Sequence, residues 1–152
     1  MDNRVNRRSF IKKTILAIVS LEIGYLFFDT FRSKTTKNDK LLFNAGKTNA
    51  FEKNKMYPFH SVKFYLSVLE DGGILALSIK CTHLGCIVQA DEKGFLCPCH
   101  ASAFNKRGEV LSPPAVRALD IFPIKIKNGE ILVDIHHPIK RQAFDKTQIT
   151  YA

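Results

Sequence analysis

The chain has 152 residues, which allows one domain with its own hydrophobic core plus an appendage and excludes two domains of ordinary size. Its formal net charge is +9, and residues 1–40 hold more than half of that excess, with nine Lys and Arg against four Asp and Glu. A basic excess beside an apolar run is typical of membrane-orientation signals. No basic and aromatic recognition motif accompanies it, so we expect no nucleic-acid partner.

The first segment, residues 1–13, contains the stretch NRRSFIK, in which an arginine pair precedes Phe10 and Lys12. This order, directly before an apolar run, resembles a twin-arginine export signal. The alternative is the ordinary basic flank of a signal-anchor. Either interpretation places the rest of the chain across a membrane.

The apolar run is predicted to form a helix that serves as a single transmembrane anchor over residues 14–31. A helix over residues 14–28 measures about 22 Å, against a hydrocarbon core of about 30 Å, so its length also fits a cleaved signal. No pair of small residues suited to cleavage follows, which favours a retained anchor. Glu22 lies within the run, and we expect it either to face a partner helix or to be tolerated in a weak signal.

Residues 32–40 contain no apolar side chain with which to pack and are predicted to be a solvated tether. Residues 41–152 are predicted to be an all-β domain, because short apolar runs alternate with turns and no helical periodicity is sustained. The runs SVKFYLSVL and ILALSI flank a turn at residues 70–73, and Asn128-Gly129 is a strong hairpin signal. From about His137 onward the alternation is lost, and a C-terminal tail is expected.

All four cysteines lie in two short motifs, CTHLGC and CPCH. Each motif offers a cysteine and a histidine at ligand spacing, as Cys81-x-His83 and Cys97-x-x-His100. Two thiolates and two imidazoles can bind one zinc ion, or one [2Fe-2S] cluster with the cysteines on one iron and the histidines on the other. Each motif also carries a further cysteine, and two thiols held close in an oxidising compartment form a disulfide. A simple zinc site has no need of such a bridge.

The two motifs resemble those of the Rieske [2Fe-2S] proteins, specifically the subunits of quinol-oxidising cytochrome bc-type complexes, over about residues 60–125. The resemblance implies a Rieske-type antiparallel β domain with a small cluster-binding subdomain, whose loops lie within about residues 80–115. It implies one [2Fe-2S] cluster per chain, with two cysteine ligands and two histidine ligands: Cys81, Cys97, His83 and His100. It further implies a disulfide between Cys86 and Cys99, and a hydrogen bond from the Ser102 hydroxyl to a bridging sulfide.

The same resemblance implies the redox subunit of a quinol:cytochrome c oxidoreductase, with catalysis shared among subunits. Such a subunit takes an electron from a menaquinol-like quinol at a cytochrome b-type membrane subunit and passes it to a c-type cytochrome. His83 or His100 is expected to hydrogen-bond the quinol, with the domain on the outer, periplasmic side of the inner membrane. The alternative is the small Rieske subunit of an arsenite oxidase-like molybdoenzyme. A zinc- or disulfide-stabilised binding module without a redox role is a third interpretation.

Three positions depart from the usual pattern of that family. Ala101 stands where glycine is usual, and strains the backbone by roughly 1 kcal/mol if φ is positive there. Phe104 stands where high-potential members have tyrosine, so a hydrogen bond to a ligand sulfur is lost and a lower potential is expected. SPP at residues 112–114 replaces the usual Gly-Pro-x-Pro of the loop that covers the cluster, for which an ordinary turn is the alternative.

Leu84 is expected at the tip that docks near the quinol pocket.

Overall fold

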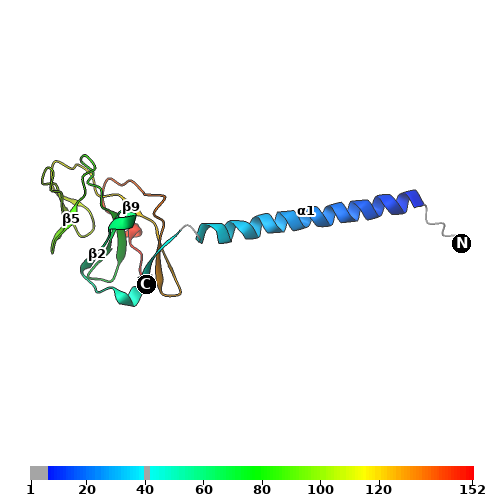
Figure 1. Ribbon diagram of the computed structural model, residues 1–152, viewed down its shortest axis with the longest axis horizontal. Helices are drawn as coiled ribbons and strands as arrows, with labels where there is room; N and C mark the ends of the chain where they lie inside the picture. The colour runs from blue at the N-terminus through cyan, green and yellow to red at the C-terminus, as the bar shows by residue number, and fades with distance from the viewer. Residues whose placement is uncertain (1–6, 40–41) are drawn as a thin grey trace. The chain divides into compact units, whose positions relative to one another are not determined.

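The computed structural model describes residues 7–39 and 42–152, which belong to two separate units. The first unit is a single helix, α1 (Arg7–Asp39), drawn in blue in Figure 1. It includes the helix predicted over residues 14–31 and continues through residues 32–39, so the structure differs from the tether predicted there. No glycine or proline occurs in that stretch to end the helix. Residues 1–6 of the predicted export signal and Lys40 of the predicted tether lie outside the described residues.

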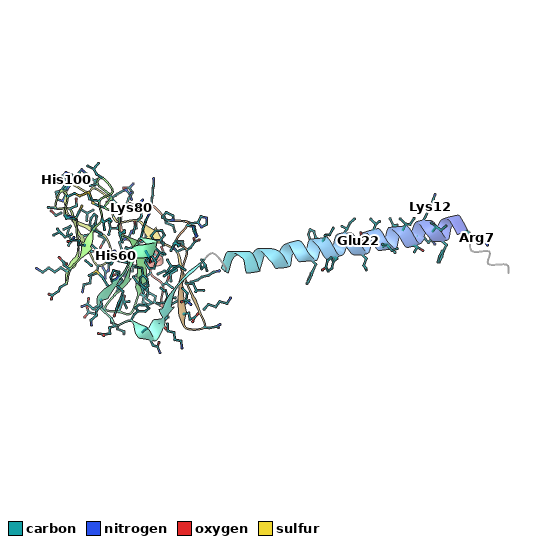
Figure 2. All side chains as sticks on the ribbon, viewed as in Figure 1. Arg7, Lys12, Glu22, His60, Lys80 and His100 are labelled. Atoms are coloured by element: carbon teal, nitrogen blue, oxygen red, sulfur yellow. A yellow bond between two sulfur atoms is a disulfide. The ribbon has the colours of Figure 1, made fainter. Side chains whose placement is uncertain are left out.

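The helix carries exposed apolar side chains between Phe10 and Phe28. Lys12 precedes most of this run and Glu22 interrupts it, as Figure 2 shows. Among the helices of residues 7–39 and 42–152, none combines the length and the apolar character that crossing a membrane requires. The predicted helix is therefore present, whereas its assignment as a membrane anchor stays a prediction.

The second unit, residues 42–152, is built from three small antiparallel sheets, which confirms the all-β class (Figure 1). The first sheet has the order β1 (Phe43–Lys47), β11 (Glu130–Val133), β10 (Ile124–Lys127). The second has the order β2 (Lys55–Phe59), β3 (Phe64–Val68), β4 (Ile74–Ser78), β9 (Ile121–Phe122). The third has the order β5 (Gln89–Ala90), β6 (Gly94–Leu96), β7 (Ala103–Asn105), β8 (Val110–Ser112). Three short 3-10 helices lie between or after the strands: Thr48–Ala50, His60–Val62 and Lys146–Gln148.

Both predicted turns are confirmed. The β3–β4 turn is closed by the Asp71 carboxylate, whose Oδ1 accepts the Gly73 N–H at 2.9 Å. The β10–β11 turn contains Asn128 and Gly129 with φ of 52° and 76°. Positive φ at both central residues is the geometry that matches the twist of a two-residue hairpin.

The second sheet separates two hydrophobic cores, because alternate residues of its central strands point to opposite faces. On β3, Phe64, Leu66 and Val68 pack in the core shared with the first sheet, whereas Tyr65 packs in the core shared with the third sheet. All five residues of β3 are buried. Burial of both faces explains why SVKFYLSVL shows no alternation of polar and apolar residues.

The expected C-terminal tail is wrong, because the last residues pack on the domain. Ile139 pairs with Ile121, and Thr150 pairs with Ile74. Phe144 and Ile149 lie against the core that the second and third sheets share. These apolar residues are spaced too irregularly to predict a strand, yet they contribute to one core and fix the segment in place.

Candidate metal centre

The first motif forms a tight loop between β4 and β5. The Cys81 N–H donates to the Cys86 carbonyl at 2.7 Å, and the Gly85 N–H donates back to the Cys81 carbonyl at 2.9 Å. Gly85 has φ of 81°, which a glycine adopts without steric cost. The loop turns the Cys81 side chain inward, where it is 3% exposed, and leaves Leu84 at its tip 70% exposed. His83 lies between these extremes, half-buried.

The second motif forms a matching loop between β6 and β7. The Cys97 N–H donates to the Ser102 carbonyl at 2.8 Å, and the Ala101 N–H donates to the Cys97 carbonyl at 3.0 Å. Ala101 has φ of 59°, the left-handed conformation for which glycine is favoured. Cys97 is buried, whereas His100 is exposed at the edge of the domain (Figure 2).

A disulfide between Cys86 and Cys99 joins the two loops, with a Cα–Cα distance of 6.6 Å. The expected pairing of these two cysteines is therefore confirmed. The rings of His83 and His100 lie edge to face, with centroids 5.0 Å apart. The structure thus brings both predicted histidines together at the surface, outside two cysteines that remain free and buried.

The sulfur atoms of Cys86, Cys97 and Cys99 lie within 4.8 Å of one another. Two of these sulfurs share the disulfide and cannot supply a thiolate, so this group leaves only Cys97 as a ligand. Its thiol contacts that of Cys81, the other free cysteine. The two free thiols, of Cys81 and Cys97, therefore lie in contact with each other.

Burial raises the pKa of the Cys81 thiol, because the thiolate would lose its hydration. The backbone N–H of His83 and the hydroxyl of Ser102 contact this sulfur and act in the opposite direction. A bound metal displaces the protons of buried thiols. Two inner sulfurs and two outer imidazoles match the unequal donor sets of a [2Fe-2S] cluster with two histidine ligands.

The loop at residues 112–119 packs against both motifs. The Ala115 N–H donates to the Ser102 hydroxyl at 3.0 Å, and the Thr82 hydroxyl donates to the Arg117 carbonyl at 2.7 Å. The Arg117 side chain also pairs with Asp120. This proline-containing loop therefore lies against both cysteine-containing loops, while its role as a cover of the cluster stays a prediction; Val116 at its tip is 89% exposed.

Sequence interpretation placed Ser102 and Phe104 near the site, and both are fully buried there. It missed Thr82, whose only signal was its position inside the first motif. It also missed Arg141, a buried arginine whose side chain bonds to the end of the proline-containing loop. Nothing in the local sequence marks that residue.

Two buried thiols and two outer imidazoles on disulfide-joined loops of an antiparallel β domain form a candidate metal site with both sulfur and nitrogen donors. The family model of the Rieske [2Fe-2S] domain matches residues 42–123, more than half of the chain. The chain therefore belongs to the Rieske [2Fe-2S] domain family. That membership and the cysteine pattern together support one [2Fe-2S] cluster in this domain.

Curated relatives match the same part of the chain. The cytochrome b6-f complex iron-sulfur subunit of Chlorobaculum tepidum is 37% identical over 83 residues, which are 53% of this chain and 45% of the relative. The subunit of the same name from Prochlorococcus marinus is 41% identical over 73 residues, 45% of this chain and 41% of the relative. The match thus spans less than half the length of either relative. A crystal structure of a plasma membrane Rieske protein from Synechocystis is 26% identical, with a TM-score of 0.44, over 60% of this chain and 97% of that one.

Proposed function

We propose that this protein is the electron-transfer subunit of a quinol-oxidising cytochrome bc-type complex. The observation that carries the proposal is the pairing of two buried cysteines with two outer histidines, on disulfide-joined loops of a Rieske domain. Relatives named as cytochrome b6-f complex subunits support an electron-transfer role. The transfer from quinol to a c-type cytochrome is our own extension of that role.

The four proposed ligands lie at two depths, because the two cysteines are buried and the two histidines are nearer the surface. Cys81 and Cys97 would hold the inner iron, and His83 and His100 the outer iron. Such a cluster supplies one-electron chemistry at about −150 to +300 mV, because neutral imidazoles replace two thiolates. The two cysteines are buried, whereas the two histidines lie nearer the surface, where a second ring nitrogen of each imidazole would be left for a hydrogen bond.

Direct contact with quinol falls to the more exposed imidazole. His100 is exposed and His83 is half-buried, so the free ring nitrogen of His100 is the better placed to hydrogen-bond a quinol hydroxyl and hold its proton. Leu84 and Val116, 70% and 89% exposed, give the tip of the domain an apolar surface. That surface suits a quinol pocket on a cytochrome b-type partner and, after release, a site on a c-type cytochrome.

Attachment to the inner membrane through α1, with the domain on the periplasmic side, completes the proposal. The disulfide between Cys86 and Cys99 supports this side, because disulfides persist in oxidising compartments. The export motif at the N-terminus supports it as well. Phe104 offers no hydroxyl to a ligand sulfur, which favours a lower potential and a menaquinol-like donor.

Metal and sulfide analysis of the full-length protein, purified anaerobically, tests the cluster. We expect iron and acid-labile sulfide in equal amounts and the electron paramagnetic resonance signal of a reduced Rieske centre. The variant His100→Ala should lose that signal, while His136→Ala, which changes an exposed histidine outside both motifs, should retain it. Zinc without sulfide would refute the proposal. Quinol should reduce the centre only in membranes that also contain the cytochrome b-type partner.

A further inference from the structure

Arg141 is a buried cation whose hydrogen-bond partners are all neutral oxygens. Arg141 is only 6% exposed. Nε donates to the Leu119 carbonyl at 2.6 Å, Nη1 donates to Gln148 Oε1 at 2.7 Å, and Nη2 donates to the Arg107 carbonyl. Burial lowers the pKa of Arg141 to about 10, so the guanidinium is still charged at neutral pH. A buried charge is costly unless its hydrogen-bonding groups are satisfied, and here each nitrogen has a partner.

The Arg107 carbonyl belongs to the β7–β8 turn, which is held at three consecutive residues. The Lys106 carbonyl accepts the buried Ser67 hydroxyl at 2.6 Å, and the Gly108 carbonyl accepts the Leu119 N–H at 2.8 Å. The donors come from β3, from the end of the proline-containing loop and, through Arg141, from the C-terminal segment. The β7–β8 turn is therefore bonded to three parts of the domain: β3, the end of the proline-containing loop and the C-terminal segment.

The turn is also shaped around the guanidinium. Gly108 has φ of 76°, and a Cβ added there would lie 2.5 Å from Nη2 of Arg141. The C-terminal segment runs beside the end of the proline-containing loop, where the Ala118 N–H donates to the Gln142 carbonyl at 3.0 Å. Ile121 and Ile139 exchange backbone hydrogen bonds in both directions. Arg141 thus lies between two backbone contacts, of which one joins the C-terminal segment to the end of the loop and the other joins it to β9.

The β7–β8 turn is linked directly to the candidate metal centre. β7 starts immediately after Ser102, and β8 runs into the loop that returns at Leu119. Midway along that loop, the Ala115 N–H bonds to the Ser102 hydroxyl. Arg141 fixes both the turn that joins these two strands and the returning end of the loop. It can therefore set how closely the loop approaches Ser102.

We infer that Arg141 is a positioning residue that holds the proline-containing loop against Ser102 and so keeps the metal centre covered. The inference rests on the proposed function only in taking the covered site to hold the cluster. A planar guanidinium reaches three acceptors in fixed directions, whereas a lysine ammonium in its place cannot reach all three with the same geometry. The charge alone is therefore insufficient for the role.

Hydrogen exchange of the full-length protein, followed by mass spectrometry of peptides spanning residues 112–121, tests the inference. In Arg141→Lys we expect exchange to rise about tenfold in these peptides, because the lysine ammonium cannot replace all three hydrogen bonds that hold the turn and the end of the loop. The midpoint potential should fall and the paramagnetic signal broaden, because the Ser102 hydroxyl is less well held. Lys140→Met, which changes the exposed neighbouring residue, should match the wild type in each measurement.

A second variant covers the case in which Arg141→Lys does not fold. Gln148→Leu removes one acceptor of the guanidinium and leaves Arg141 in place, and we expect a smaller rise in exchange over the same peptides. Exchange equal to wild type in a folded variant would overturn the inference. If the wild type contains no iron or sulfide, the proposed function fails, and the exchange comparison still decides whether Arg141 holds the loop.

Discussion

The Ser102 hydroxyl accepts the backbone N–H of Ala115 at 3.0 Å and contacts the Cys81 thiol, so one buried oxygen links the covering loop to a proposed ligand. Because the N–H occupies an acceptor position, the hydroxyl hydrogen is left to point toward sulfur. A hydrogen bond to sulfur stabilises the reduced, more negative state of a cluster. The loop thereby orients a hydrogen-bond donor toward the sulfur of a proposed ligand.

Ser102→Ala should therefore lower the midpoint potential. Because the hydrogen bond to sulfur is lost, we expect a fall of about 59 mV, which corresponds to a tenfold change in a one-electron equilibrium. The variant should also lose about 1–3 kcal/mol of stability, because the Ala115 N–H is left without its acceptor. Redox titration and thermal unfolding measure the two effects. Ser112→Ala is the control, since that hydroxyl makes a long bond of 3.5 Å to the Pro113 carbonyl. An equal change in both variants would count against the role of Ser102.

Ala101→Gly should stabilise the domain by about 1 kcal/mol. Ala101 is held at φ of 59°, where a Cβ is unfavourable and glycine is not. Thermal unfolding of the wild type and the variant provides the measurement. Ala103→Gly is the matched control, because Ala103 lies in β7 without a positive φ and glycine weakens a strand. If both substitutions destabilise the domain, the strain at Ala101 is not relieved by the change.

The two motifs and the two hairpins could be predicted from sequence because each is determined by neighbouring residues. Cys81 and His83 are held by their own loop, and Asn128-Gly129 sets its own turn. The contribution of Arg141 could not be predicted, because two of its three acceptors lie 22 and 34 positions away along the chain. The helix over residues 32–39 was missed for a different reason. The lack of apolar residues indicated a solvated segment, but a solvated segment that contains no Gly or Pro can still form a helix.

Phe104→Tyr should raise the midpoint potential by about 59 mV, equivalent to a tenfold change in the redox equilibrium. The added hydroxyl would donate to a ligand sulfur and favour the reduced state. Phe95→Tyr is the control, because Phe95 pairs with Phe104 across β6 and β7 and is also buried. We expect the control to lose stability without gaining potential. An unchanged potential in Phe104→Tyr would mean that this ring does not face a ligand sulfur.

Replacing both disulfide cysteines, as Cys86→Ser with Cys99→Ser, should destabilise the domain by about 3 kcal/mol. The bridge closes a segment with a sequence separation of 13, and this estimate follows from the entropy of closing a loop of about that length. Thermal unfolding of the oxidised wild type, the reduced wild type and the double variant provides the measurement. The reduced wild type should resemble the double variant. A double variant as stable as the oxidised protein would show that the other contacts between the two loops suffice.

The contact between Tyr151 and Asp71 makes stability depend on pH at both ends of the range. The Gly73 N–H and the Tyr151 hydroxyl lower the pKa of Asp71 below its usual 3.8. The ionised Asp71 carboxylate therefore stabilises the fold above pH 3.8, and this stabilisation is lost as pH falls through the folded-state pKa. The bond to Asp71 raises the pKa of Tyr151 above 10.0, so that contribution is present below pH 10 and is lost at higher pH.

Tyr151→Phe removes this bond and should flatten the dependence of the melting temperature on pH below about 4 and above about 10. Tyr57→Phe is the control, because the Tyr57 hydroxyl accepts a backbone N–H and does not bond a carboxylate. Curves of the same shape for the wild type and Tyr151→Phe would mean that solvent screens the contact completely. A flatter curve for Tyr151→Phe alone would show that the C-terminal residues, which sequence alone suggested were a tail, stabilise the fold through the β3–β4 turn.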